Sequence, residues 1–128
     1  MKEIEHRSDI AILVSTFYHA VRQDTLLGPI FNRQLSEEQW PDHLEKLTDF
    51  WVTALFGVAC FKGNPIRAHR QVDKSLHHTI RQFHFETWLR LWFQAIDSLY
   101  IGELAERAKN AAGRMAANQY MAIEKQRT

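Results

Sequence analysis

The stretch FHFETWLRLWFQAIDSLY, residues Phe83–Tyr100, has the clearest helical pattern in this 128-residue chain. Its large apolar residues recur at intervals of three and four: Phe85, Trp88, Leu89, Trp92, Ile96 and Leu99. This is the period of one face of an α-helix. The stretch therefore predicts a helix whose apolar face lies in the protein core.

The same period appears on both sides of this stretch. A first helix can be capped by Ser8-Asp9, a second restarts at Pro41 after the capping-box sequence Ser36–Gln39, and a last one runs from Glu103 to about Lys125. The last helix has many alanines on its apolar face, which let a neighbouring helix approach closely. No strand-like alternation occurs, so we expect an all-α protein with one domain over residues 1–128.

Two glycines predict where helices end. Gly28 and Pro29 mark a turn, and we expect residues 27–32 to form an irregular connection in which Phe31 points inward. Gly57 is expected to end the second long helix.

Composition excludes several classes of function. The formal net charge is +1 and the charges are interspersed, so neither nucleic acid nor a membrane is an expected partner. The single cysteine, Cys60, excludes an internal disulfide framework and a cysteine-based zinc site. The charged N-terminus lacks the apolar run of a signal peptide, and no stretch is apolar enough to span a bilayer. We expect a cytoplasmic protein.

Aromatic residues and histidines are abundant for a chain of this length, with 8 Phe, 4 Trp, 3 Tyr and 7 His. Aromatic side chains can line a flat apolar ligand, and histidine can bind its metal. The sequence Asn64-Pro65-Ile66-Arg67-Ala68-His69 is a capped helix start that ends in a histidine, with long apolar helices on both sides. His69 is therefore a candidate metal ligand.

A haem requires one strong axial nitrogen, an apolar slot for its ring and cations near its two propionates. His69 can supply the nitrogen, and the candidate cations are Lys46, Arg67 and Arg70. Residue spacing alone gives only weak support to this haem hypothesis. His43 lies on or beside an apolar stripe and is by default a helix-end or core histidine. Periodicity alone favours a core role for Tyr18 as well.

A resemblance strengthens the haem hypothesis. In order and spacing, a set of short motifs resembles the group III truncated haemoglobins of bacteria, from about Ile10 to Tyr120. The motifs are Phe17-Tyr18, Leu27-Gly28-Pro29-Ile30-Phe31, Trp40-Pro41-Asp42-His43, Phe50-Trp51, Gly63-Asn64-Pro65 with His69, and Trp88-Leu89. Each motif is weak alone, but their order and spacing together are specific.

The resemblance implies a truncated globin fold, with helices packed two over two around haem b. Carried over by motif, His69 would be the proximal iron ligand. Tyr18 would be the distal tyrosine, and His43 the histidine of the distal helix. Phe31 would pack on the haem ring, Trp88 would be the distal-side tryptophan, and Leu47 would face the bound ligand. Phe50 and Trp51 would also contact the cofactor.

The interval from His69 to Trp88 is several residues longer than in commoner members of that family. The extra length would be absorbed between Asp73 and Gln82. A shift of the alignment there would give the proximal role to His78, so His78 is the alternative to His69.

The expected function is binding of O₂, NO or CO at a five-coordinate iron with a polar distal pocket. His43 could act as a gate, as a further donor or as a sixth iron ligand. Haem-dependent peroxide or nitric oxide detoxification, with an unidentified reductase as partner, is an alternative. Two other readings stay open: a cofactor-free helical interaction module, and a non-haem metal site at His77, His78 and His84.

Overall fold

The computed structural model describes residues 1–58 and 81–127, with side chains described as far as residue 122. The helices are α1 (Arg7–Gln23), α2 (Gly28–Gln34), α3 (Trp40–Phe56), α5 (Gln82–Leu99) and α6 (Glu103–Arg127), with a 3-10 turn η1 at Glu37–Gln39. Within these ranges the only strand-like feature is an isolated bridge between Lys2 and Tyr100. The all-α prediction is confirmed.

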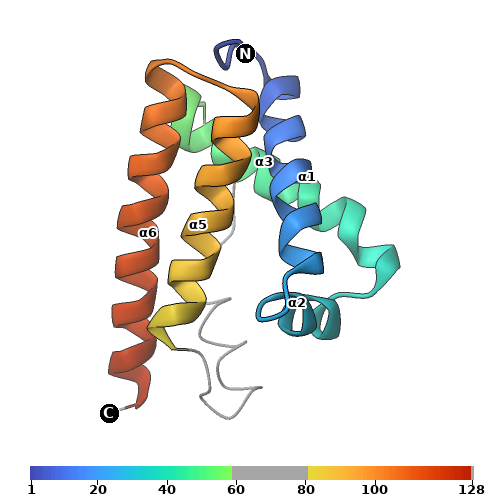
Figure 1. Ribbon diagram of the computed structural model, residues 1–128, viewed down its shortest axis with the longest axis vertical. Coiled ribbons are helices and arrows are strands. Elements are labelled where there is room, and N and C mark those ends of the chain that lie inside the picture. The colour runs from blue at the N-terminus through green and yellow to red at the C-terminus, as the bar shows by residue number, and fades with distance from the viewer. Residues whose placement is uncertain (59–80, 128) are drawn as a thin grey trace.

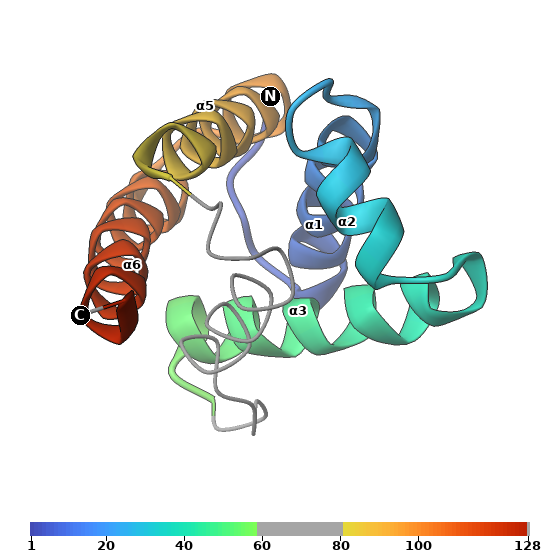
Figure 2. The ribbon, with the colours of Figure 1, turned by 90° about the horizontal axis from the view of Figure 1, so that it is seen from below.

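The long helices form two pairs. α5 and α6 run antiparallel, side by side, while α1 crosses α3 (Figure 1). The two pairs meet where α1 packs on α5 and where α3 packs on α6. Figure 2 shows the molecule from below. In this view α3 lies across one side, and α2 lies at the end of α1. None of the described helices has the length and apolar character needed to cross a membrane.

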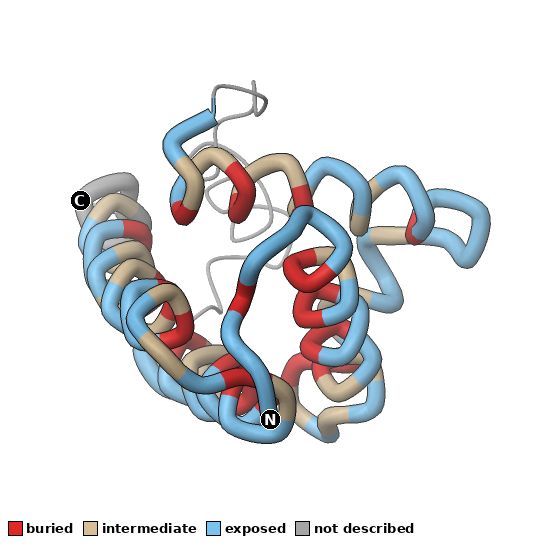
Figure 3. Tube along the Cα trace, turned by 90° about the horizontal axis from the view of Figure 1, so that it is seen from above, coloured by how far each residue is buried: buried red, intermediate tan, exposed pale blue. Residues whose placement is uncertain are grey.

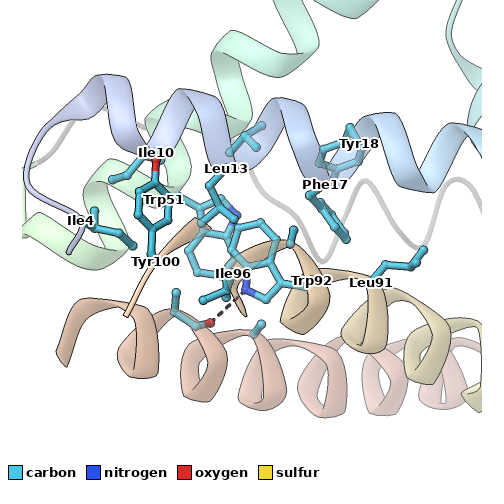
Figure 4. Close-up of a cluster of buried hydrophobic side chains, with 14 of the residues drawn as sticks. Ile4, Ile10, Leu13, Phe17, Tyr18, Trp51, Leu91, Trp92, Ile96 and Tyr100 are labelled. Atoms are coloured by element: carbon cyan, nitrogen blue, oxygen red, sulfur yellow. Dashed lines mark hydrogen bonds between the residues drawn. The ribbon is translucent and has the colours of Figure 1, made fainter. Parts of the chain in front are cut away.

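The core lies between the two pairs, where the buried residues of α1, α3, α5 and α6 turn toward one another (Figure 3). Its centre is Trp92 of α5, which is fully buried and stacks on Trp51 of α3 with ring centroids 4.5 Å apart. The Trp92 Nε1–H donates to the Ala108 carbonyl of α6 over 3.2 Å (Figure 4). One side chain thus joins three helices.

Alanines make up much of the buried face of α6, as the sequence predicts. Ala105, Ala108, Ala112 and Ala116 are buried. Because their side chains are small, α6 can lie close to α5, and the carbonyl of Ala108 comes within hydrogen-bonding distance of the Trp92 indole.

The helix ends follow the predicted signals, with one shift. The Ser36 backbone N–H donates to the Gln39 side chain over 2.8 Å, and Gly57 ends α3 with a positive φ of 73°. α1 begins at Arg7, before the predicted Ser8-Asp9 cap. The Asp9 carboxylate lies in the first turn and accepts hydrogen bonds from the backbone N–H groups just before the helix.

The predicted irregular connection at residues 27–32 is wrong, because Gly28–Gln34 is helix α2. Pro29 lies in the first turn of α2, where a missing N–H removes no helical hydrogen bond. The Asp24 carboxylate organises the preceding turn by accepting from the N–H groups of Leu26 and Leu27, both over 2.9 Å. Gly28 is needed for close packing, because a Cβ there would lie 2.5 Å from the Arg22 carbonyl oxygen.

Candidate functional site

Tyr18 of α1 is buried at a point where two other helices, α2 and α3, place rings against it. Its ring centroid lies 5.9 Å from Phe31 of α2, and 5.9 Å and 5.8 Å from Trp40 and His43 of α3. The Phe31 and His43 rings meet it nearly edge to face, a favourable geometry for aromatic rings. Figure 4 shows Tyr18 on α1, beside Phe17 and away from Trp51. The crossing of α1 with α2 and α3 therefore creates a site that no single segment contains.

The Tyr18 phenol stays protonated at neutral pH. Burial raises the pKa of Tyr18 to about 12, and a hydrogen bond from Trp88 of α5 acts in the opposite direction. The indole N–H of Trp88 can only donate, so the Tyr18 oxygen is the acceptor. The O–H of Tyr18 remains available as a donor to a third group.

His43 places an uncharged imidazole beside this phenol. Burial lowers the pKa of His43, and the nearby Lys46 charge lowers it further. Among the residues that the structure describes, none hydrogen-bonds the buried Nε2 of His43 or the buried Nε1 of Trp40. Unpaired buried polar atoms are costly unless a water or ligand meets them.

The helices that carry this polar group also carry large apolar side chains that are only partly buried. Four of the predicted cofactor contacts pack against the core but remain partly exposed: Phe31, Leu47, Phe50 and Trp88. Partly exposed aromatic area beside a few polar atoms is typical of a binding site for a flat apolar ligand. Trp51, by contrast, lies within the core against Trp92, and Lys46 is exposed on α3 one turn after His43.

These described residues fit a haem. The structure brings together Tyr18, Phe31, His43 and Trp88, and provides both polar donors and apolar contacts. The expected iron ligand His69, its alternative His78, and the cations Arg67 and Arg70 lie outside the described residues.

The non-haem metal site gains no support within the described ranges. They contain no group of three metal-ligating side chains. His84 Nδ1 accepts a hydrogen bond from the Arg81 backbone N–H over 2.8 Å at the start of α5, and His77 and His78 lie outside the described residues.

The sequence predicts no role for two further residues of the site, Trp40 and Arg22. Trp40 contacts both Tyr18 and His43, and the Trp-x-x-His spacing, one helical turn, is a local signal for it. Arg22 lies over the Trp40 ring with its Cζ 4.5 Å from the centroid. It has no local signal, because Trp40 lies on another helix.

No protein-family model matches the chain. The Group 3 truncated hemoglobin ctb of Campylobacter jejuni is 34% identical over 104 residues, which is 80% of this chain and 78% of that protein. The crystal structure of the group III truncated hemoglobin from Campylobacter jejuni matches with a TM-score of 0.84 and 31% identity, over 96% of this chain and 95% of that one. The similarity in sequence and in fold extends over most of both proteins.

Proposed function

Because this chain belongs to the group III truncated haemoglobins, we propose that it binds haem b and takes up a diatomic gas (O₂, NO or CO) beside Tyr18, His43 and Trp88. Membership confirms the predicted truncated-globin fold and a haem-binding globin role. The kind of haem, the gas and the residues that contact them are our proposal.

The main support for this proposal comes from the residues that surround Tyr18. Its phenol is buried among rings from α2 and α3 and accepts a hydrogen bond from Trp88. A hydroxyl in a buried site gains free energy when a polar group meets it, so the position favours a polar ligand close to the Tyr18 oxygen. A diatomic gas is small enough to meet this O–H in an otherwise aromatic site.

Haem held by one histidine supplies an open iron coordination position for a diatomic gas. We assign the iron ligand to His69 and the propionate contacts to Lys46, Arg67 and Arg70. The apolar contacts of the ring are assigned to Phe31, Leu47, Phe50 and Trp51. We further propose that the protein acts in the cytoplasm.

The distal donors act in series. In this proposal the Trp88 indole donates to the Tyr18 oxygen and orients the phenol, so that the Tyr18 O–H would point at the gas. A donor near the outer atom of a polarised diatomic ligand stabilises the bound state. This arrangement favours tight binding with slow release rather than bulk transport.

The absorption spectrum of the purified protein tests the proposal. We expect a Soret band in the ferric and ferrous forms, and a shifted band when CO is added to the ferrous form. A colourless protein that cannot be reconstituted with hemin would refute haem binding.

Tyr18→Phe is expected to raise the O₂ dissociation rate by roughly tenfold or more, because the ligand loses its direct donor. Trp88→Phe is expected to raise the rate by less, because it removes only the group that orients Tyr18. Stopped-flow release of O₂ measures both rates.

Tyr100→Phe is the matched control for the tyrosine variant. Tyr100 is also buried, but its hydroxyl donates to the Asp9 carbonyl over 2.7 Å, far from Trp88. If Tyr100→Phe changes O₂ release as much as Tyr18→Phe, the assigned role of Tyr18 is wrong.

The uncharged state of His43 favours a second candidate function. A neutral imidazole beside a bound ligand can accept a proton during peroxide or nitric oxide chemistry. Such turnover requires electrons from a reductase partner. If a His43→Leu variant consumes peroxide and nitric oxide as fast as the parent protein, this role is excluded.

A further inference from the structure

The Arg22 side chain contacts α2 and α3, two described helices whose rings lie against Tyr18. It extends from α1, and its Nε donates to the Asn32 Oδ1 of α2 over 2.9 Å. Its Nη2 pairs with Glu37 of η1, and its guanidinium lies over the indole of Trp40, the first residue of α3. This one cation therefore contacts α2, η1 and α3 close to Tyr18.

Trp40 connects this cation to the distal histidine. The indole is almost fully buried, and its centroid lies 5.5 Å from the His43 ring at an interplanar angle of 84°. It also contacts the Tyr18 ring, which His43 meets at a similar distance. Trp40, Tyr18 and His43 thus form a mutually packed trio, with Arg22 against its tryptophan.

Ring packing, rather than hydrogen bonding at Nε2, holds the His43 imidazole in this orientation. The Nε2 atom has no partner within the described ranges. A side chain that packing alone holds in place takes the rotamer that its neighbouring rings allow. The position of the Trp40 ring should therefore decide how often His43 lies against Tyr18.

We infer that Arg22 is a positioning residue that keeps His43 turned toward Tyr18 by clamping the indole of Trp40 between α1 and α3. This inference rests on the proposed function, in which His43 and Tyr18 face the bound gas. Arg22 would thereby set how readily a gas reaches Tyr18, although Arg22 itself does not touch the gas.

The interactions of Arg22 differ in what they can contribute. The Glu37 side chain is 82% exposed, so its ion pair with Arg22 adds little to stability. The cation over the buried Trp40 ring is directional and holds the indole in one place. Removing the cation should therefore alter the orientation of His43 more than the stability of the fold.

The test replaces Arg22 by Gln in the full-length, haem-loaded protein with CO bound. Nuclear Overhauser effects between the His43 ring protons and those of Tyr18 and Trp40 report the inward orientation. We expect the ratio of inward to outward His43 to fall by about two- to fivefold, which corresponds to the strength of a cation–π contact. The CO association rate should rise, while the dissociation rate, which depends on Tyr18, should stay near that of the parent.

Arg7→Gln is the matched control. Arg7 is another arginine of α1 that ties this helix to α3, through Glu45 at 2.6 Å and Asp49 at 2.7 Å, but no contact joins it to Trp40. We expect the His43 contacts of this variant to match those of the parent. An equal change in Arg7→Gln and Arg22→Gln would overturn the inference, as would unchanged contacts in Arg22→Gln.

Glu37→Gln provides a second route to the same answer if Arg22→Gln does not fold. It removes the charged anchor of Arg22 and leaves the cation in place, so we expect a smaller change of the same sign. The Overhauser measurement is also made on the full chain without haem. A change in His43 there supports the role of Arg22 even if haem binding fails, so the two proposals fail independently.

Discussion

Replacing His69 by alanine is expected to abolish the Soret band of the purified protein. A haem with one protein ligand depends on that nitrogen for its axial bond, and the remaining apolar contacts do not fix the iron. The absorption spectrum after reconstitution with hemin measures the loss. Added imidazole should restore the band if the alanine variant is folded and only the ligand is missing.

His78→Ala is the control for this prediction, because His78 is the alternative ligand in the same segment. We expect it to keep the parent spectrum. If the band survives His69→Ala and disappears in His78→Ala, the assignment moves to His78 and the haem proposal remains. Both histidines lie outside the described residues. The pair of variants therefore decides which of them is the iron ligand.

Trp92→Ala is expected to lower the free energy of unfolding by about 3–5 kcal/mol. Trp92 fills the centre of the core, where it stacks on Trp51 and meets Phe17 with centroids 4.9 Å apart. Alanine leaves a cavity between three helices and removes the hydrogen bond to Ala108. Urea unfolding followed by circular dichroism measures the change.

Phe93→Ala is the matched control, because Phe93 is the next residue of α5 and its side chain is 39% exposed. We expect a loss below about 1 kcal/mol, as for most surface positions. Equal losses in the two variants would show that Trp92 is not the centre of the core. Trp92→Phe should fall between them, because it keeps an aromatic ring but leaves the Ala108 carbonyl without its donor.

Much of the fold could be predicted because its signals are local. The three- and four-residue spacing in Phe83–Tyr100 corresponds to α5, and the Ser36–Gln39 capping box and Gly57 mark the ends of elements within one or two residues. These signals arise from interactions between residues a few positions apart. The resemblance then added the family, which the similarity to a known relative confirms.

The same local reasoning failed at α2. By their local meaning, Gly28 and Pro29 predict a turn, because both residues interrupt helices. Both residues are compatible with a helix here, because Pro29 lies in the first turn of α2 and Gly28 lies against the Arg22 carbonyl. That contact is part of the packing of α2 on α1, which no helical period reveals.

By itself, this sequence determines a set of amphipathic helices, because periodicity and capping depend on residues that are near neighbours in the chain. Its motifs also identify the family. Only the tertiary structure brings the Tyr18 phenol to the Trp88 indole and places Arg22 over Trp40. These pairs join α1 to α5 and α1 to α3. Their geometry depends on how the helices cross, and crossing is decided by the shape of whole helix faces. The Phe83–Tyr100 stretch thus predicts that Trp88 lies on an apolar face, while the crossing of α1 and α5 makes it a hydrogen-bond donor to Tyr18.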